Sequence, residues 1–245
     1  MGFLVKSSMK KSLPYLYVGL TFGFCGSLTT FSSWVYAIVN GPDSLIQLLT
    51  GLTLPLCAFL LGEDLCSSLS LLSRCAPAPG NRCPSDKTVC QVLCVAVGLG
   101  VIIGLGVVLG NSRQETPDGV ALVSCVLAPV GALPRYVLQR LLNDRIPWLE
   151  GRFQLGTLAA NMAAVALYAF VHDCYNGGQK ECHYVAVGIC GSMSTVSSLM
   201  SEFVKDYRKG KAWAYLYVIV SVILAVFISG IEKIATGYRQ KEGQD

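Results

Sequence analysis

The sequence predicts an all-α membrane protein with seven transmembrane helices, organised as an inverted repeat of four-helix units joined by a linker helix. Three observations predict this class. The 245 residues are 53% hydrophobic and only 14% charged, whereas a soluble domain usually carries about 25% charge. The charged residues are confined to the segments between seven uncharged windows, and one apolar segment occurs twice. A soluble globular protein is therefore not expected.

The first three windows are long enough to span a bilayer, because crossing roughly 30 Å of hydrocarbon takes about 20 helical residues. Window 12–42 follows Lys6, Lys10 and Lys11 and is too long for a cleavable signal peptide, so it is expected to anchor itself. Window 44–62 follows directly. Window 88–112 is apolar on every side, as a lipid-surrounded or buried helix is.

The last four windows are 119–134, 153–172, 182–201 and 212–231. The first of these is short and must extend past Arg135 to about Leu142 in order to span. The other three have the length of a membrane span and contain no Lys, Arg, Asp or Glu. They complete seven predicted transmembrane helices.

The distribution of Lys and Arg predicts the orientation of the chain. Alternate loops share a side of the membrane, and this places 14 basic residues on one side and 5 on the other. By the positive-inside rule the N-terminus is cytosolic and the C-terminus extracellular. The net charge of +4 is explained in the same way, so no nucleic-acid partner is expected.

The 11 cysteines do not have the pattern of a disulfide scaffold or a zinc site. Most fall within apolar windows, where a thiol is typical of a small buried residue. Cys174 and Cys182 flank a short loop that is predicted to face outside. A disulfide between these two is therefore a hypothesis.

An internal repeat relates two apolar segments. GFCGSLTTFSSW at residues 23–34 matches GICGSMSTVSSL at residues 188–199, with a constant offset of 165 and seven identical positions. The segments lie in the first and sixth predicted helices. Because an odd number of crossings separates them, the two copies are expected to run in opposite directions through the membrane.

The repeat also predicts the domain organisation. Residues 1–87 would hold the third and fourth helices of a first unit and a cytosolic loop, 88–112 a linker helix, and 113–245 a complete four-helix second unit with a tail. The linker adds the crossing that makes the two units antiparallel. The chain is thus expected to be a nine-helix protein that lacks its first two helices.

The repeated segment combines glycine with hydroxyl side chains, which is unusual for a membrane helix. Glycine permits broken helix geometry, exposed carbonyls can bind a small cation, and hydroxyl donors can replace the water shell of an anion. Small residues at helix contacts are the alternative explanation for a single copy. Phe31 and Trp34, three residues apart, are expected to share a face with Ser27 and Thr30, and aromatic edges favour an anion.

With these motifs, and with GALPRY at residues 131–136 and GTLAAN at 156–161, the chain resembles the Fluc/CrcB/FEX fluoride channels, in particular the two-domain eukaryotic fluoride export proteins. The resemblance covers nearly the whole chain. It implies passive fluoride channels built from two antiparallel four-helix units. It also implies a structural sodium ion bound by backbone carbonyls, which by position come from Gly26, Thr29, Gly191 and Ser194.

The resemblance further implies a vestibule arginine, Arg135, and a set of pore-lining residues. The second unit has Val196 and Leu199 where the first has the aromatic pair, so one mixed pore is expected. The first unit has Leu49 in place of the fourth-helix tyrosine. The expected pore-lining residues are Phe31, Trp34, Thr30, Ser33, Asn161, Thr195, Ser198, Tyr217 and Ser221.

The function implied is export of cytosolic fluoride across the plasma membrane, which confers fluoride resistance. The partners are the fluoride ion and the lipid bilayer; the full-length form would be monomeric, and this chain would need the missing helices from elsewhere. An inactive truncated form and an ion-coupled small-solute transporter remain alternatives, although coupling usually needs an intramembrane carboxylate. A seven-helix receptor does not fit the charge distribution, and an enzyme is not expected because no catalytic acid pair lies in a window.

Overall fold

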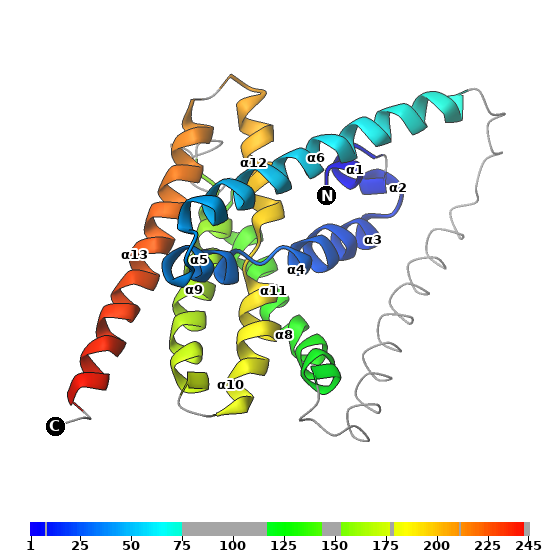
Figure 1. Cartoon of the computed structure of the whole chain (residues 1–245). Coiled ribbons are helices and arrows are strands. Elements are labelled where there is room, and N and C mark those ends of the chain that lie inside the picture. Colours follow the sequence, from blue (N-terminus) through cyan, green and yellow to red (C-terminus); the bar gives the residue numbers. More distant parts are fainter. Residues whose placement is uncertain (8, 75–116, 144–152, 177–178, 211, 243–245) are drawn as a thin grey trace.

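The computed structural model describes residues 1–7, 9–74, 117–143, 153–176, 179–210 and 212–242, and every regular element in these ranges is a helix (Figure 1). The predicted window 88–112 lies outside the described residues. Within them, five stretches are long and apolar enough to cross a membrane: Leu16–Asn40, Ser44–Ser68, Leu155–His172, Glu181–Tyr207 and Trp213–Ala235. They fall on five of the seven predicted windows.

The N-terminal part contains one interrupted helix followed by one long helix. Its elements are α1 (Gly2–Lys6), α2 (Met9–Ser12), α3 (Pro14–Val18), the π-helix η1 (Gly19–Cys25), α4 (Gly26–Leu28), α5 (Phe31–Asn40) and α6 (Ser44–Arg74). Helix α6 contains Pro55 and runs twelve residues past the predicted end of its window at residue 62. The expected loop therefore begins as helix.

The C-terminal part is a bundle of longer helices. Its elements are α8 (Pro117–Leu142), α9 (Leu155–Asn176), α10 (Lys180–Val185), the π-helix η2 (Ala186–Cys190), α11 (Gly191–Met193), α12 (Val196–Tyr207) and α13 (Trp213–Glu242). Helix α8 extends past Arg135 to Leu142, as its short window requires.

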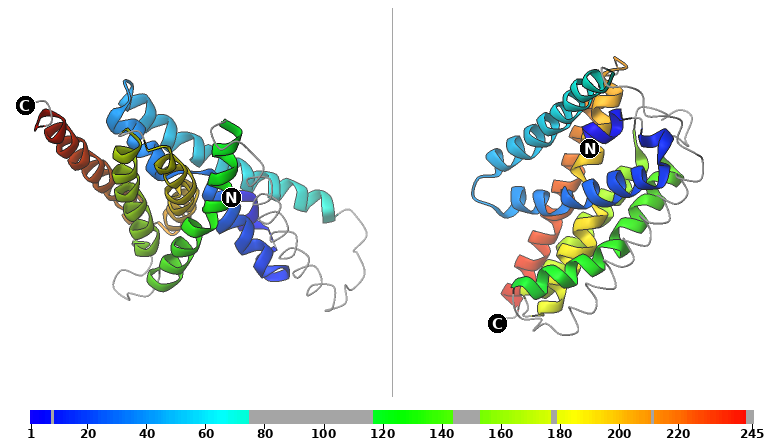
Figure 2. Two further views of the ribbon diagram at one scale, coloured as in Figure 1. Left: turned by 90° about the horizontal axis from the view of Figure 1, so that it is seen from below. Right: turned by 90° about the vertical axis from the view of Figure 1, so that its right-hand side faces the viewer.

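The two parts cross one another. Helices α9, α12 and α13 lie along a common direction, whereas α4, α5 and α6 run across it (Figure 1). The side view agrees, with the blue and cyan helices lying across the green to red ones (Figure 2). Helix α5 packs against both α9 and α13. The direction in which each part would traverse a bilayer stays a prediction.

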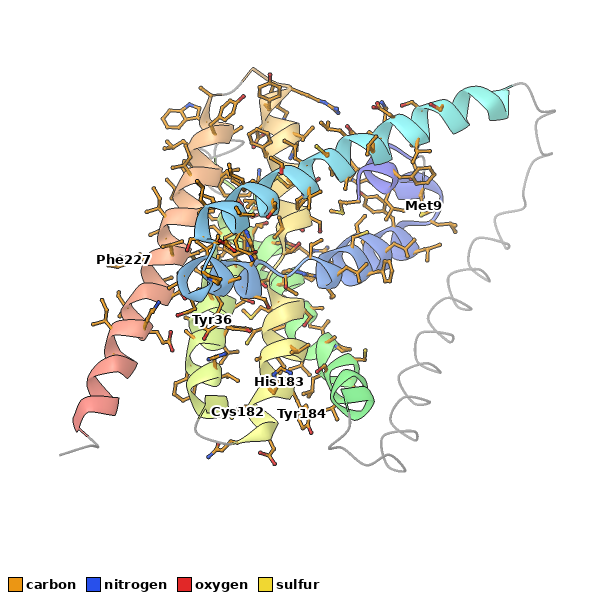
Figure 3. The ribbon with its side chains drawn as sticks, in the orientation of Figure 1. Met9, Tyr36, Cys182, His183, Tyr184 and Phe227 are labelled. Carbon is orange, nitrogen blue, oxygen red and sulfur yellow. The ribbon has the colours of Figure 1, made fainter. Side chains whose placement is uncertain are left out.

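The distribution of side chains is inverted relative to that of a water-soluble protein. Large apolar side chains point outward, and Phe227 on α13 is 64% exposed (Figure 3). Polar side chains, including Arg135, Asn161 and Thr195, are fully buried. This arrangement suits a lipid environment, where an inward-facing polar group can be satisfied only by the protein.

One ion pair joins the N-terminal part to the C-terminal bundle. Arg208, which follows α12, donates from Nη1 to Glu63 Oε1 at 2.9 Å and from Nη2 to Glu63 Oε2 at 2.5 Å. The side chain of Glu63 on α6 is 6% exposed and that of Arg208 is 53% exposed. The hydrogen bonds to Glu63 raise the pKa of Arg208 above its ordinary value, so the guanidinium stays charged.

Cys174 and Cys182 are both free thiols in the structure, so no disulfide joins them there. Their side chains are nevertheless hydrogen-bonded to each other, and the thiol of Cys182 in α10 (Figure 3) lies 3.6 Å from Gln179 Oε1. A disulfide between the two stays a hypothesis.

Candidate functional site

Two helix breaks occur at equivalent positions of the sequence repeat. In each copy a π-helix ends at a cysteine, one short α-helix follows, two residues are extended, and a new helix begins. The extended residues are Thr29 and Thr30 in the first copy and Ser194 and Thr195 in the second. Every one of these boundaries is offset by 165 residues, so the repeat in sequence is also a repeat in local geometry.

The break corrects one expectation from the sequence. Ser27 and Thr30 were expected to share a helix face with Phe31 and Trp34, but the helix is interrupted at Thr29 and Thr30. Phe31 and Trp34 do lie together on α5, with ring centroids 5.5 Å apart in an edge-to-face arrangement. Helical spacing therefore gives no reason to place the hydroxyl of Ser27, in α4, beside these two rings.

The two breaks meet and complete one another. Ser32 N donates to Ser194 Oγ at 3.0 Å, and Ser197 N donates to Thr29 Oγ1 at 3.0 Å. Ser32 and Ser197 are equivalent residues in the first turns of α5 and α12. Each break therefore supplies a hydroxyl cap to the helix of the other copy, in the way that an N-cap satisfies a helix terminus.

A second pair of hydrogen bonds repeats this reciprocity. Ser32 Oγ donates to Cys190 O at 3.4 Å, and Ser197 Oγ donates to Cys25 O at 3.1 Å. In a two-fold arrangement, a contact from residue i to residue j is matched by a contact between their equivalents in the other copy. The crossing is thus pseudo-symmetric at the level of individual bonds.

Asn161 on α9 is fully buried and binds the second break. Its Oδ1 accepts from Thr195 N at 2.8 Å and its Nδ2 donates to Thr195 O at 3.2 Å. Thr195 in turn caps α12 by accepting from Ser198 N at 3.2 Å. The structure therefore brings together three of the predicted pore residues, Asn161, Thr195 and Ser198, in one hydrogen-bonded group.

Helix α5 of the first copy lies against the helices that carry the other predicted pore residues. Phe31 and Tyr217 belong to one buried cluster, which Val196 and Leu199 also line. Ser221 is buried one turn from Tyr217 and donates to its carbonyl at 2.7 Å. Aromatic side chains of the first copy thus pack against α13 of the second.

Trp34, Thr30 and Ser33 are less deeply placed and are half-buried. Trp34 Nε1 donates to Gln47 O at 2.7 Å, so its indole is tied to α6. The methyl group of Thr30 faces Gly191, where an added Cβ would lie 3.2 Å from it. Thr30 therefore packs beside the crossing, against Gly191 of the other copy.

Glu202 is a half-buried carboxylate that lies directly after the uncharged window 182–201. It lies in α12 within an apolar stretch, and it accepts from Thr157 Oγ1 at 2.5 Å and from Tyr217 Oη at 2.9 Å. Asn143 Nδ2 donates to it at 3.4 Å. The window ended at Ser201, but Glu202 follows Ser198 by four residues and so shares its helix face, a signal that the sequence did contain.

Arg135 is fully buried and reaches the crossing from α8. Its Nη1 lies 3.4 Å from Ser194 O, to which it donates. Its guanidinium also lies against Gly26, where an added Cβ would fall 2.7 Å from Cζ and Nη1. Arg135 therefore lies beside both breaks, and the vestibule role that the resemblance implies stays a prediction.

The sodium site expected at Gly26, Thr29, Gly191 and Ser194 stays a prediction. The structure does bring these four residues to one place, through the contacts at the crossing. Two of the four carbonyls already accept hydrogen bonds, Thr29 O from Val196 N at 3.1 Å and Ser194 O from Arg135.

Comparison with known proteins identifies relatives of the chain. Residues 122–231 match the family model described as CrcB-like protein, Camphor Resistance (CrcB). Fluoride export protein 1 of Neurospora crassa is 30% identical over 248 residues, covering 86% of this chain and 45% of the relative. Fluoride export protein 1 of Candida albicans is 24% identical over 266 residues, covering 96% of this chain and 65% of the relative. The chain thus spans between about half and two thirds of the length of these relatives. No solved structure matches it.

Proposed function

The chain belongs to the family of CrcB-like and fluoride export proteins, and from this premise we propose that it is a passive fluoride channel. Its relatives carry fluoride export in their names, and its apolar helices make it a multi-pass membrane protein. A fluoride-permeable membrane protein, rather than an enzyme, is the function that these observations support.

The observation that carries the proposal is the pair of broken helices that cross in a buried, hydroxyl-rich region. Each break places backbone and hydroxyl groups of Thr29, Thr195 and their neighbours inside an apolar protein. Such groups can replace the hydration shell of a small anion without a strong fixed charge that would trap it. Irregular backbone in a membrane protein is tolerated where it lines a cavity or is buried in protein.

One mixed pathway is the geometry that we propose. Helix α5 contributes Phe31, and α9 and α13, against which it packs, contribute Asn161, Tyr217 and Ser221. Positive aromatic edges from the first copy would face amide and hydroxyl donors from the second. We further propose that the two copies cross the membrane in opposite directions within seven helices, the N-terminus being cytosolic and the membrane the plasma membrane.

The test is fluoride efflux from liposomes that contain the purified full chain, followed with a fluoride electrode. A passive channel releases fluoride, and not chloride, only when valinomycin lets potassium leave to balance the charge. A version extended by the first two helices of a related protein is measured in parallel. If both folded proteins are silent, the proposal is wrong.

Glu202 favours a second candidate, ion-coupled transport. A carboxylate within an apolar helix is the usual device for coupling, and Glu202 supplies one beside Tyr217. Coupled transport predicts fluoride movement that is driven by an imposed pH gradient without valinomycin and is lost in Glu202→Gln. A passive channel predicts that, without valinomycin, the pH gradient moves no more fluoride in either protein than in protein-free liposomes, where only neutral HF crosses the lipid.

A further inference from the structure

The guanidinium of Arg135 lies where the two broken helices cross. The short helices η1–α4 and η2–α11 end at the crossing, so their last carbonyls point toward it. The C-terminal end of a helix carries partial negative charge and favours a cation. The fully buried guanidinium of Arg135 occupies this position.

The guanidinium lies against both copies, at Ser194 of the second and at Gly26 of the first, which are not equivalent positions of the repeat. In the second copy it donates to Ser194 O at 3.4 Å. In the first copy it lies on Gly26, where an added Cβ would fall 2.7 Å from Cζ. Gly26 and Ser194 are two of the four residues that the family resemblance assigned to a sodium ion, and the guanidinium donates to the carbonyl of one of them, Ser194.

One hydrogen bond at the crossing has no counterpart between the equivalent residues of the two copies. Val196 N donates to Thr29 O at 3.1 Å. Among the described residues the equivalent bond, from Phe31 N to Ser194 O, is absent, and Ser194 O accepts from Arg135 instead. The two copies therefore differ in hydrogen bonding at Ser194 O, the carbonyl to which the Arg135 guanidinium donates.

We infer that the guanidinium of Arg135 takes the place of a bound sodium ion at the crossing of the two broken helices. The site does not fit sodium while the guanidinium lies there, because a second cation at the same place would be repelled by the first. Gly26 is the residue that makes room for the guanidinium. The inference does not depend on whether the protein conducts fluoride.

The inference is tested by thermal unfolding of the purified full chain in sodium, potassium or N-methylglucamine chloride at equal ionic strength. The wild-type midpoint is expected to be the same in all three salts. Arg135→Gln removes the cation and is expected to unfold at a lower temperature, with a sodium-specific rise of about 4 °C or more at saturation. Arg135→Lys keeps a cation and is expected to stay insensitive to sodium.

Two further variants sharpen the test. Gly26→Ala would displace the guanidinium while leaving Arg135 in the chain, and is expected to reproduce the sodium response of Arg135→Gln. Arg140→Gln is the matched control, because Arg140 is exposed on the same helix and donates to Tyr136 Oη at 2.8 Å. It is expected to behave like the wild type.

Retention of radioactive sodium by each protein after desalting gives a second readout that does not depend on stability. Sodium-specific stabilisation of the wild type, or sodium retained by it, would overturn the inference even if Arg135→Gln cannot be purified. An Arg135→Gln protein that folds and shows no sodium response would also overturn it, because the crossing would then need no cation.

Discussion

Asn161 satisfies both backbone groups of an extended residue with one side chain. Thr195 lies outside the regular hydrogen bonding of α11 and α12, and the amide of Asn161 replaces that bonding by donating to Thr195 O and accepting from Thr195 N. Because the site is fully buried, no water can substitute easily. The shape of the second break therefore depends on this residue.

Asn161→Leu is expected to abolish fluoride efflux while the protein still inserts. The change leaves two buried backbone groups unpaired, at a cost of about 1–3 kcal/mol each, so the break should lose its defined shape. Efflux from liposomes and the yield of folded protein are the measurements. Asn40→Ala, at the exposed end of α5, is the control. Wild-type efflux in Asn161→Leu would remove Asn161 from the pathway.

Tyr217→Phe is expected to lower the free energy of unfolding by about 1 kcal/mol, the usual net contribution of one hydrogen bond. The phenol of Tyr217 donates to Glu202 Oε2 at 2.9 Å, and the variant keeps the ring but removes this donor. Chemical denaturation in detergent measures the change. Tyr215→Phe, exposed on the same helix, should have almost no effect. Equal effects of the two changes would contradict the prediction.

At the scale of residues the sequence predicted roles for polar side chains but not their contacts. Asn161, Tyr217 and Ser221 were expected to line a pore; they are buried, and the pore itself stays a prediction. Arg135 was not expected at the crossing, because a long side chain at a helix end can extend to the membrane surface or into the core. Its direction depends on the space left at Gly26, a feature of packing that one sequence does not reveal.

Helices α5 and α12 are each capped by a hydroxyl that belongs to the other copy. A helix terminus leaves backbone N–H groups without partners, and a hydroxyl that accepts from one of them typically contributes about 1 kcal/mol. Thr29 and Ser194 make this contribution in trans, to Ser197 N and Ser32 N. Neither helix is therefore complete without the other copy.

Thr29→Ala and Ser194→Ala are expected to destabilise the protein by similar amounts, about 1 kcal/mol each. The similarity follows from the equivalence of the two caps, and the double variant reports how strongly the caps are coupled. Denaturation of all three variants supplies the data. Thr53→Ala serves as the control, since its exposed hydroxyl donates within its own helix to Leu49 O. A single variant that matches this control would contradict reciprocal capping.

Gly188→Ala and Gly23→Ala are expected to differ although they change equivalent positions of the repeat. An added Cβ at Gly188 would lie 2.8 Å from Ser124 O and 2.9 Å from Leu127 Cβ, so α8 and η2 would have to separate. At Gly23 no atom of the described residues lies within 4 Å of an added Cβ. Gly188→Ala should cost about 1–3 kcal/mol and Gly23→Ala little, as measured by thermal unfolding. Equal costs would show that η2 is not packed as described.

At the scale of elements, the sequence predicted the helix breaks from residue types, whereas the prediction that relied on helical periodicity was wrong. Glycine and hydroxyl residues in an apolar run indicated a break, and the structure has one in each copy. The face shared by Ser27, Thr30, Phe31 and Trp34 was wrong because it assumed an unbroken helix through the same run. Two extended residues are enough to interrupt the regular spacing of side chains along a helix. Thr29, the first of them, bonds to the other copy, and these contacts are not visible in the sequence.

At the scale of the whole molecule, apolar side chains face outward and the polar ones are enclosed. Cys57 on α6 and Cys125 on α8 belong to the outward set, whereas Cys190 in η2 is buried. Since both exposed thiols lie in apolar helices, the medium they face is expected to be lipid. The third predicted window remains outside this comparison.

Thiol labelling of the protein in liposomes tests this distribution. Cys57 and Cys125 are expected to react with a lipid-soluble maleimide and not with a charged thiosulfonate, because the charged reagent does not enter hydrocarbon. Cys190 should resist both until the protein is denatured. Single-cysteine variants and mass spectrometry identify the labelled residue. Rapid labelling of Cys57 by the charged reagent would place α6 in water.

The reciprocal crossing has a consequence for how the two copies can diverge. In an assembly of two identical chains, one mutation changes both sides of the two-fold axis at once. Here the copies share one chain, so each side can change alone, provided that the bonds between them survive. Both copies have hydroxyl residues at the bonding positions, Thr29 and Ser194 in one equivalent pair and Ser32 and Ser197 in the other. The residues at the neighbouring equivalent positions differ, Phe31 in the first copy and Val196 in the second. The hydrogen bonds between the two breaks thus restrict which residues can occupy the bonding positions, whereas the adjacent positions can differ between the copies.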